Sequence, residues 1–219
     1  MRQTTLKNRT GWMISAATMV FCLAAGTISS QAADSVVVIP MGNHGAPVAK
    51  TGQTTSTMPG DDGALQKGVS VSGRFKDNGN GTVTDGLTGL IWLKEGQCLK
   101  FFSEDTTGVN NRPWGFAIDA ANNLANSFCN LTDGSKAGDW RLPNLKELES
   151  LMDLGQANPV LPIGCPLAAS TATTGYYWSS TVYAPDPSKS AWHIHFSNGI
   201  VLTDFKTVNS SVRAVRGGQ

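Results

Sequence analysis

The stretch RFKDNGNGTVTDGLTGLIWL, residues 74–93, decides the fold. Two short runs of alternating polar and apolar residues flank Asn-Gly repeats at residues 78–81. Asn and Gly tolerate the positive φ angles that tight hairpin turns require. A second turn over residues 85–89 leads into residues 90–93, a nearly continuous apolar run typical of a central strand. The stretch therefore predicts a small β-meander, and the folded domain is expected to begin near Gly73.

Two helices are predicted downstream of this meander. The first follows Pro113, because the missing N–H of proline costs little at a helix start. Its apolar residues recur at steps of three and four, which places them on one face. These residues are Trp114, Ala117, Ile118, Ala121, Leu124, Ala125 and Phe128. We expect this face to lie in the core.

The second predicted helix begins after Asn144. The side chain of Asn144 can cap the helix, while Glu147 can reach back to complete a capping box. Its apolar stripe consists of Leu145, Leu148, Leu151 and Met152. Gly155 is expected to end the helix as a C-terminal glycine cap.

After a proline-rich loop, apolar residues recur at every second position, which is the spacing of a β-strand. Strands are predicted over residues 176–183, 191–196, 200–205 and 211–216, with an Asn-Gly hairpin turn before the third. The chain thus runs from strands through two helices back to strands. This order predicts a loop-rich α+β fold in which two helices pack on short antiparallel sheets.

The amino-terminal part has a different character. Residues 1–32 have the basic start, the apolar stretch and the small-residue cleavage site of a secretory signal peptide. The apolar stretch is about 14 residues, short of the roughly 20 that a spanning helix needs. We therefore expect export to the periplasm, the cell surface or the medium, with no transmembrane anchor after cleavage. Residues 33–72 are predicted to be a flexible linker, and residues 73–219 the folded domain.

Composition limits the class of partner. The chain carries 17 basic and 16 acidic residues, a formal net charge of +1. It lacks the polycationic character of nucleic-acid-binding proteins, so nucleic acid is not expected as a partner. A charged content of 15% together with 24 glycines suits a loop-rich secreted domain.

Signal cleavage would leave three cysteines, Cys98, Cys129 and Cys165, in a compartment that permits disulfides. Three single pairings are possible, and sequence alone does not choose among them. We favour Cys98 with Cys129 because both flank the same predicted helical segment. Cys165 would then remain a thiol or pair with another molecule. The chain has no Cys-x-x-Cys spacing, so neither a zinc knuckle nor a thioredoxin-type redox centre is predicted.

Six motifs, in order, resemble those of the Lcl C-terminal domain family, which is named after a bacterial collagen-like adhesin. They are residues 74–85, 87–92, 139–144, 177–180, 196–199 and 215–218. The resemblance implies a C-type-lectin-like fold, shared with formylglycine-generating enzymes, over residues 73–219. That adhesin binds sulfated glycosaminoglycans and promotes aggregation and biofilm formation, so an adhesion-type role is implied. No Gly-x-y repeat precedes the domain, so collagen-driven trimerisation is not implied.

Cations and aromatic residues are the candidate ligand contacts. A polyanion would need a local cationic cluster, because the bulk charge of the domain gives no attraction. The candidates for such a cluster are Arg141, Lys206, Arg213 and Arg216. Aromatic side chains suit flat sugar faces, and the surface candidates are Tyr177, Tyr183 and Trp192. In contrast, Trp92, Trp140 and Trp178 are expected to be mainly structural.

Two sets of residues carry atoms that could bind a metal ion. Asp77, Asn78, Asn80 and Asp85 could offer oxygens to calcium, but glycines occupy positions where a calcium loop needs ligands. We therefore favour turn chemistry there, and no cofactor is expected. His193 and His195 lie two apart on a predicted strand and could hold zinc, but the third histidine lies in the linker. A solvated strand face is the favoured interpretation.

Catalytic motifs are missing from the sequence. It has no Gly-x-Ser-x-Gly elbow, no His-Glu-x-x-His and no phosphate-binding glycine loop. The pair of late cysteines used by formylglycine-generating enzymes is also missing, since none follows Cys165. We expect a non-catalytic binding module that recognises glycan or an envelope protein. Two alternatives stay open: a self-associating structural protein of the envelope, and a metal-dependent enzyme that uses His193 and His195.

Overall fold

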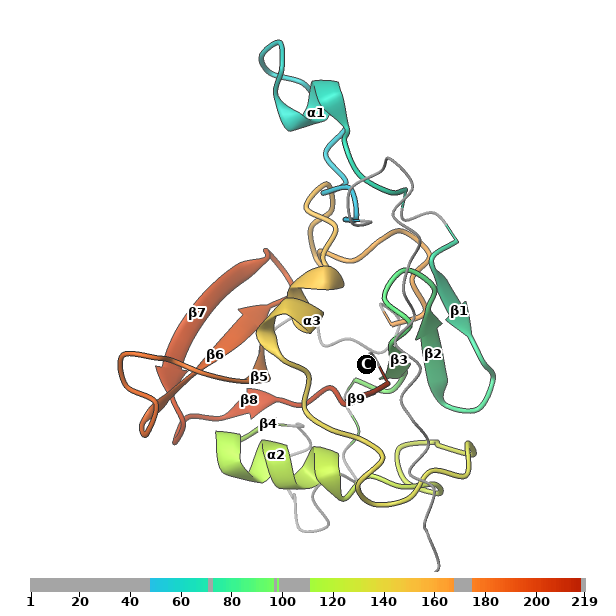
Figure 1. The fold of residues 1–219 in the computed structure, drawn as a ribbon, viewed down its shortest axis with the longest axis vertical. Coiled ribbons are helices and arrows are strands. Elements are labelled where there is room, and N and C mark those ends of the chain that lie inside the picture. Colours follow the sequence, from blue (N-terminus) through green and yellow to red (C-terminus); the bar gives the residue numbers. More distant parts are fainter. Residues whose placement is uncertain (1–47, 71–72, 97, 99–110, 168–174, 218–219) are drawn as a thin grey trace, which may run out of the picture. The chain divides into compact units, whose positions relative to one another are not determined.

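The structure is a computed structural model that describes residues 48–70, 73–96, 98, 111–167 and 175–217 (Figure 1). The expected signal peptide lies outside these residues. The helices are α1 (Asp62–Leu65), α2 (Trp114–Asn122) and α3 (Leu145–Ser150). The strands are β1 (Phe75–Asp77), β2 (Thr82–Asp85), β3 (Ile91–Leu93), β4 (Asn111–Arg112), β5 (Tyr176–Val182), β6 (Ser190–His195), β7 (Ile200–Phe205), β8 (Ser210–Ser211) and β9 (Val215–Arg216). In the described part of the chain, no helix has the length and apolar character needed to cross a membrane.

The strands form two sheets, which confirms the predicted α+β class. The four-stranded sheet has the order β1-β2-β3-β9, so the predicted meander is completed by the last strand of the chain. The five-stranded sheet has the order β4-β8-β5-β6-β7 and is antiparallel except between β5 and β8. Strands close to the C-terminus therefore contribute to both sheets. The C-type-lectin-like assignment stays a prediction from the resemblance.

Two apolar clusters form the core, one with each longer helix. Leu148 of α3 packs in a cluster with Tyr177 of β5 and Ile194 of β6. Ala117 of α2 packs in a second cluster with Trp178 of β5. Because successive residues of a strand point to opposite faces, the five-stranded sheet is covered on both faces where these strands pass.

The N-terminus of α3 confirms the predicted capping box. The Asn144 side chain accepts a hydrogen bond from the Glu147 amide at 2.9 Å, and the Glu147 carboxylate accepts one from the Asn144 amide at 2.7 Å. The helix ends at Ser150, with Leu151 as its C-cap, so the prediction that Gly155 ends it is wrong. Gly155 instead lies against the backbone of Gly52.

The first predicted helix is shorter than its pattern suggests. α2 ends at Asn122, and the chain then forms turns. Leu124 is still buried, but Phe128 is 50% exposed, so its assignment to the core face is wrong. Apolar residues continue past the end of the helix because the turns that follow fold back and pack in the same cluster.

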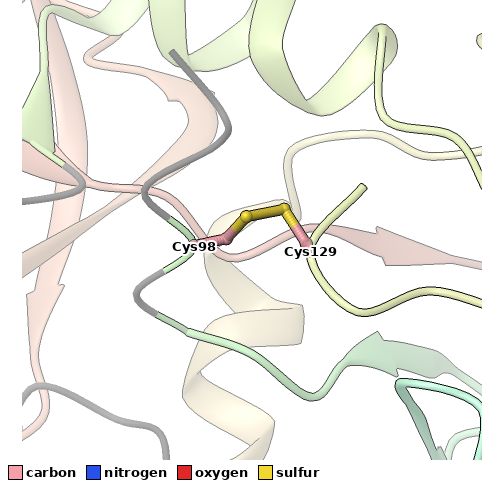
Figure 2. The surroundings of a disulfide bond; sticks show 2 residues. All are labelled: Cys98 and Cys129. Carbon is pink, nitrogen blue, oxygen red and sulfur yellow. A yellow bond between two sulfur atoms is a disulfide. The ribbon is translucent and has the colours of Figure 1, made fainter. Parts of the chain in front are cut away.

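A disulfide joins Cys98 to Cys129, the pairing favoured from sequence (Figure 2). It links the segment after β3 to a turn that follows α2, with 5.3 Å between the two Cα atoms. Both cysteines are buried in the α2 cluster. Cys165 lies in the α3 cluster and is only 5% exposed, so burial keeps its thiol away from other molecules.

Residues 48–70 belong to the expected flexible linker, but the structure shows a helix, a bridge and hydrogen bonds there. Asp61 caps α1 by accepting a hydrogen bond from the Ala64 amide. A parallel bridge pairs Ala49 with Val69. The segment also binds the loop after α3, since the Leu154 amide donates to the Thr51 carbonyl at 2.6 Å. The spacing of residues within 48–70 does not predict this ordered structure, because the structure depends on contacts with a loop about a hundred residues away.

Candidate functional site

Three aromatic side chains lie on one face at an end of the five-stranded sheet. Tyr183, just after β5, donates its amide to the Ser190 carbonyl at 3.0 Å, and Ser190 is directly opposite Phe205 in the register of β6 and β7. Paired residues of antiparallel strands point to the same face. Tyr183, Ser190 and Phe205 therefore form one row, with a small residue between two aromatic ones.

Trp192 lies in the neighbouring row on the same face, because it is two residues from Ser190. Its ring meets the Tyr183 ring edge to face, with centroids 5.8 Å apart and planes at 78°. Tyr183 and Trp192 are partly exposed, and Phe205 is 58% exposed. We call Tyr183, Trp192 and Phe205 the aromatic platform. The first two residues were predicted from sequence as surface aromatics, but Phe205 was not, because only the register of the Asn-Gly hairpin places it on the same face.

The platform has the chemistry of a site for flat, partly apolar ligands. Aromatic faces accept apolar ring faces, while hydrogen-bonding groups set orientation. Thr203 is directly opposite Trp192 and points to the same face. The platform thus combines aromatic area with a hydroxyl group beside Trp192.

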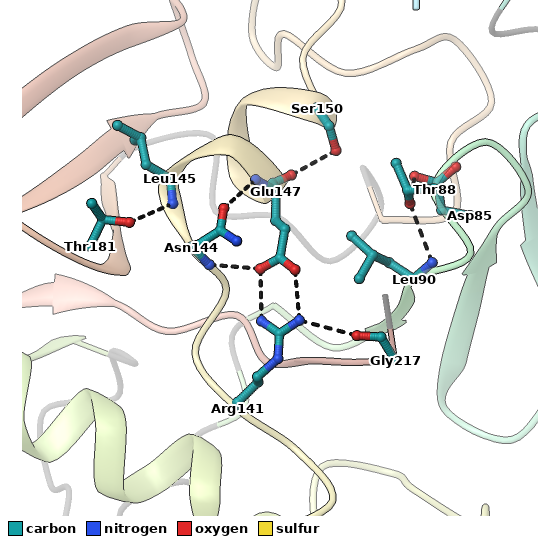
Figure 3. A network of polar contacts seen from close by, with 10 residues as sticks. All are labelled: Asp85, Thr88, Leu90, Arg141, Asn144, Leu145, Glu147, Ser150, Thr181 and Gly217. Carbon is teal, nitrogen blue, oxygen red and sulfur yellow. Dashed lines mark hydrogen bonds and ion pairs between the residues drawn. The ribbon is translucent and has the colours of Figure 1, made fainter. Parts of the chain in front are cut away.

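Arg141, a predicted ligand contact, is bound within the protein instead (Figure 3). Its guanidinium donates to both Glu147 carboxylate oxygens, at 2.7 and 2.6 Å, and to the Gly217 carbonyl at 3.1 Å. The hydrogen bonds that the guanidinium donates to Glu147 raise the pKa of Arg141 above its ordinary value. Because Glu147 also closes the capping box with Asn144, Arg141 fixes the loop that enters α3.

This capping network also reaches β5. The Leu145 amide donates to the Thr181 hydroxyl at 3.0 Å, and the Ser180 amide donates to the Pro143 carbonyl at 2.7 Å. Both β5 residues lie where the pairing with β6 is irregular, between Trp178 and Val182. The irregular stretch of β5 therefore anchors the start of α3, directly before the strand reaches the platform.

The other three candidate cations each have a separate partner. Arg213 is 1% exposed and donates to the Leu93 carbonyl at 3.0 Å, so its expected surface position is wrong. Arg216 forms an ion pair with Asp133 at 3.1 Å. The Lys206 ammonium lies 3.9 Å from the centre of the Trp114 ring and donates to a backbone carbonyl. The four candidate cations, Arg141, Lys206, Arg213 and Arg216, are thus each engaged by a different group of the protein.

Tyr177, expected at the surface, is fully buried, and this expectation is wrong. Its ring packs edge to face on Phe196, with centroids 5.4 Å apart. The reason is that β5 is covered on both faces, so strand alternation brings no side chain to solvent at this point. Trp92, Trp140 and Trp178 are buried, as expected of structural tryptophans.

His193 is 2% exposed, so the expectation of a solvated histidine face is wrong for it. Its ring stacks with Tyr176 and Trp178, at centroid distances of 4.1 and 5.1 Å. Its Nδ1 lies 3.2 Å from the Ser210 hydroxyl. Tyr176 also contacts the His195 ring at 4.6 Å, so one phenol ring lies against both imidazoles. Among the described residues, no three histidine, cysteine or carboxylate side chains are grouped to hold a metal ion.

The candidate calcium ligands serve the turns. One Asp77 oxygen pairs with Lys94 at 2.6 Å, and the other accepts the Gly79 amide. Asn80 accepts two hydrogen bonds from Thr82. Asn78 binds Thr82 and Thr84, and Asp85 is paired with Arg74. These contacts support turn chemistry as the role of the Asn-Gly stretch.

A groove of about 400 Å³ lies between the N-terminal segment and α3. Its apolar lining comes from Val48, Leu87, Met152 and Leu154. The groove was not predicted from sequence, because part of its wall belongs to the expected linker. It contains no aromatic side chain, in contrast to the aromatic platform.

Comparison with known families gives one finding for this chain. The family model described as the Lcl C-terminal domain matches residues 81–216, which is more than half of the sequence. No curated protein matches the chain.

Proposed function

Since the chain belongs to the Lcl C-terminal domain family, we propose that it is an exported, non-catalytic binding module of the bacterial envelope or surface that holds glycan on the aromatic platform. The observation that carries this proposal is the position of Tyr183, Trp192 and Phe205 on one face of the sheet. Single exposed apolar residues are ordinary on a protein surface, whereas a group of aromatic ones indicates an interaction site.

Two observations support export and a surface role. The family and the disulfide between Cys98 and Cys129 both suit an exported protein, because disulfides persist in oxidising compartments.

The side chains that an enzyme would use support binding rather than catalysis. Ser179 is fully buried, and its hydroxyl donates to the Trp192 carbonyl at 2.8 Å. His193 is occupied by its stacking partners and by Ser210. Neither group is placed as an accessible nucleophile or base.

A glycan array that includes heparin, other sulfated glycosaminoglycans and cell-wall oligosaccharides tests the proposal. We expect binding by the exported chain, and a loss of about tenfold or more for Trp192→Ala and Tyr183→Ala, since central aromatic contacts dominate binding energy. Phe116→Ala is the matched control, because Phe116 is 62% exposed on α2, outside the platform. Its binding should equal that of the unaltered chain.

Two results would overturn the proposal. One is no binding to any glycan at low or high salt, with or without calcium, in which case a protein ligand would take its place. The other is glycan binding that survives Trp192→Ala and Tyr183→Ala while the folded state is intact by near-ultraviolet circular dichroism.

A further inference from the structure

A second cavity, of about 460 Å³, lies between the segment 48–70 and the loop that follows α3. Its two walls are joined, since the Leu154 amide donates to the Thr51 carbonyl at 2.6 Å and the Gln53 side chain donates to the Leu154 carbonyl at 2.9 Å. In Figure 1 the segment lies next to this loop. The volume is in the range of cavities that bind small molecules. The cavity shares Lys50 with the apolar groove described above.

The cavity contains a buried carboxylate that the protein itself uses only in part. Asp153 is one of the lining residues and is 7% exposed. Its Oδ1 atom accepts a hydrogen bond from the Gly155 amide at 3.0 Å. Among the described residues, no group donates a hydrogen bond to Oδ2, and no cation pairs with this carboxylate. One oxygen of Asp153 is therefore available to a ligand in the cavity.

The segment 48–70 is shaped to cover this carboxylate. Gly52 lines the same cavity and has a φ angle of +89°, in the left-handed region that favours glycine. A Cβ atom at Gly52 would overlap Oδ1 of Asp153, so a larger residue could not approach the carboxylate this closely. The close approach holds Asp153 in the wall of the cavity, and the segment and the loop build the site together.

A cationic donor suits Asp153 better than a neutral one. A buried carboxylate is costly unless a partner compensates its charge. Charge-assisted hydrogen bonds are roughly twice as strong as neutral ones, so an ammonium compensates more of this cost than a hydroxyl does. A metal ion would need several ligand side chains, and in the described part of the chain no three such side chains are grouped. The carboxylate therefore favours a protonated amine.

The cavity also has a positively charged residue, Lys50. It is half-buried and belongs to the wall formed by the segment 48–70. No described carboxylate, Asp153 included, forms an ion pair with its ammonium. Lys50 would repel a ligand with two ammonium groups, whereas it would attract a ligand carboxylate. A molecule that carries both an ammonium and a carboxylate therefore matches the two charged residues of the cavity.

The other lining groups suit the rest of such a molecule. The Gln53 side-chain nitrogen donates to Leu154, which leaves the side-chain oxygen as an acceptor for a second N–H of an ammonium. Pro162 and Ile163 give the loop side of the cavity an apolar part, and Ile163 is 86% exposed. An apolar side chain of the ligand can cover this exposed surface.

We propose that this cavity binds a small α-amino acid, with its ammonium on Oδ2 of Asp153 and its carboxylate toward Lys50. Amino acids with apolar side chains should bind more tightly than glycine, because they also contact Pro162 and Ile163. The site uses other elements than the aromatic platform, so it can succeed or fail independently of glycan binding.

Isothermal titration calorimetry of the exported chain tests the site. L-leucine is the first probe, because its side chain is apolar, and the other α-amino acids complete the panel. We expect saturable binding of L-leucine. N-acetyl-L-leucine has no ammonium and should bind about tenfold or more weakly, because hydrogen bonds to charged groups contribute that much. Isoamylamine, which is leucine without its carboxylate, should also bind more weakly.

Two variants and a control assign the contacts. Asp153→Asn keeps an oxygen for the Gly155 amide but removes the charge, so it should fold and bind L-leucine about tenfold or more weakly. Lys50→Gln should weaken the binding of L-leucine but not that of isoamylamine. Asp119→Asn is the matched control, because Asp119 is exposed on α2, outside the cavity. Its affinity for L-leucine should equal that of the unaltered chain.

The outcomes separate this inference from the glycan proposal. Trp192→Ala should still bind L-leucine, because it leaves the cavity intact. Near-ultraviolet circular dichroism identifies any variant that has lost its fold, and if Asp153→Asn has done so, Lys50→Gln decides. A chain that binds no α-amino acid, or that binds N-acetyl-L-leucine as tightly as L-leucine, would overturn the inference. Undiminished binding of L-leucine by folded Asp153→Asn or by Lys50→Gln would overturn it as well.

Discussion

The imidazole of His193 lies almost parallel to the ring of Tyr176, with centroids 4.1 Å apart and planes at 16°. Trp178 stacks with the same imidazole, and the Ser210 hydroxyl lies within hydrogen-bond distance of Nδ1. A ring in this position belongs to the core, where its neutral form packs without the cost of burying a charge.

Stability should therefore fall in mild acid because of His193. Burial lowers its pKa below the ordinary value of 6.5; Asp204 opposes this shift and His195 adds to it. The unfolded chain then binds the proton more readily than the folded chain, so stability is lost as pH falls below about 6.5. We expect urea unfolding to show a smaller loss between pH 7.5 and 5.5 for His193→Phe than for the unaltered chain. Equal losses in both proteins would contradict this role.

We expect Asp85 to make a large contribution to the free energy of unfolding at neutral pH. It is fully buried and forms an ion pair with Arg74. Burial alone would raise its pKa, but hydrogen bonds from Arg74, Thr88 and the Leu87 amide hold the pKa below its ordinary value. We expect Asp85→Asn to lower the free energy of unfolding at pH 7 by about 3 to 5 kcal/mol, because it leaves Arg74 buried without its counter-charge.

Two measurements check the role of Asp85. The stabilisation is present above a pH of about 4 and is lost as pH falls through the folded pKa, so the difference between Asp85→Asn and the unaltered chain should shrink in acid. Asp77→Asn is the control, since Asp77 pairs with Lys94 where both side chains are more than a third exposed. Its loss should be much smaller than that of Asp85→Asn, because an ion pair exposed to solvent contributes little to stability. A similar loss for both variants would contradict the argument.

The capping network of α3 should show graded losses. Asn144→Ala removes one cap and should lower the free energy of unfolding by about 1 kcal/mol. Glu147→Ala should lower it by about 2 to 3 kcal/mol, because its carboxylate serves both the Asn144 amide and Arg141. Glu149→Ala on the same helix is the control, since Glu149 pairs with the exposed Lys146. Chemical denaturation should give the largest loss for Glu147→Ala, a smaller one for Asn144→Ala and the smallest for Glu149→Ala. A larger loss for Glu149→Ala than for Glu147→Ala would refute this prediction.

Loss of the disulfide should destabilise the domain without changing the core around Cys165. For a separation of 31 residues, the chain-entropy model gives a contribution of about 3 to 4 kcal/mol. We expect Cys98→Ser with Cys129→Ser to lose that much in guanidinium unfolding. A reductant should lower the stability of the unaltered chain to the same level and leave the double variant unchanged. Insensitivity of the unaltered chain to reductant would be inconsistent with this contribution.

Attachment of the segment 48–70 should depend on a glycine after α3. A Cβ atom at Gly155 would lie 2.1 Å from the Gly52 carbonyl oxygen, so Gly155→Ala should push the two backbones apart. We expect faster hydrogen exchange at the Leu154 amide, whose hydrogen bond to the Thr51 carbonyl joins the segment to the loop after α3. Gly115→Ala is the control, because a Cβ atom there meets nothing within 4 Å. Unchanged exchange in Gly155→Ala would show that the contact is not needed.

The parts of the fold that depend on near neighbours were predictable. The Asn-Gly turns, the capping box of Asn144 and Glu147, and the hairpin of β6 and β7 all appear where their patterns place them. Each rests on residues only a few positions apart, whose φ angles and hydrogen bonds are set locally. The pairing of Cys98 with Cys129 was favoured for a similar reason, since both flank one helical segment.

The candidate site was only partly predictable. Tyr183 and Trp192 were named as surface aromatics, and the structure brings their rings into contact. Tyr177 and Arg213 were named on the same grounds, yet both are buried. Residue type does not separate these two pairs, because each side chain has both an apolar part and a polar end.

The sequence by itself determined the α+β order of elements, the turns and caps that bound them, and the disulfide that was favoured among three pairings. Only the tertiary structure decided which strand faces are covered, and so which aromatic residues form the platform and which lie in the core. The physical reason is that burial depends on packing partners far along the chain. α2 and α3 cover opposite faces of β5 and bury Trp178 and Tyr177, whereas the end of the sheet beyond them leaves Trp192 open to solvent.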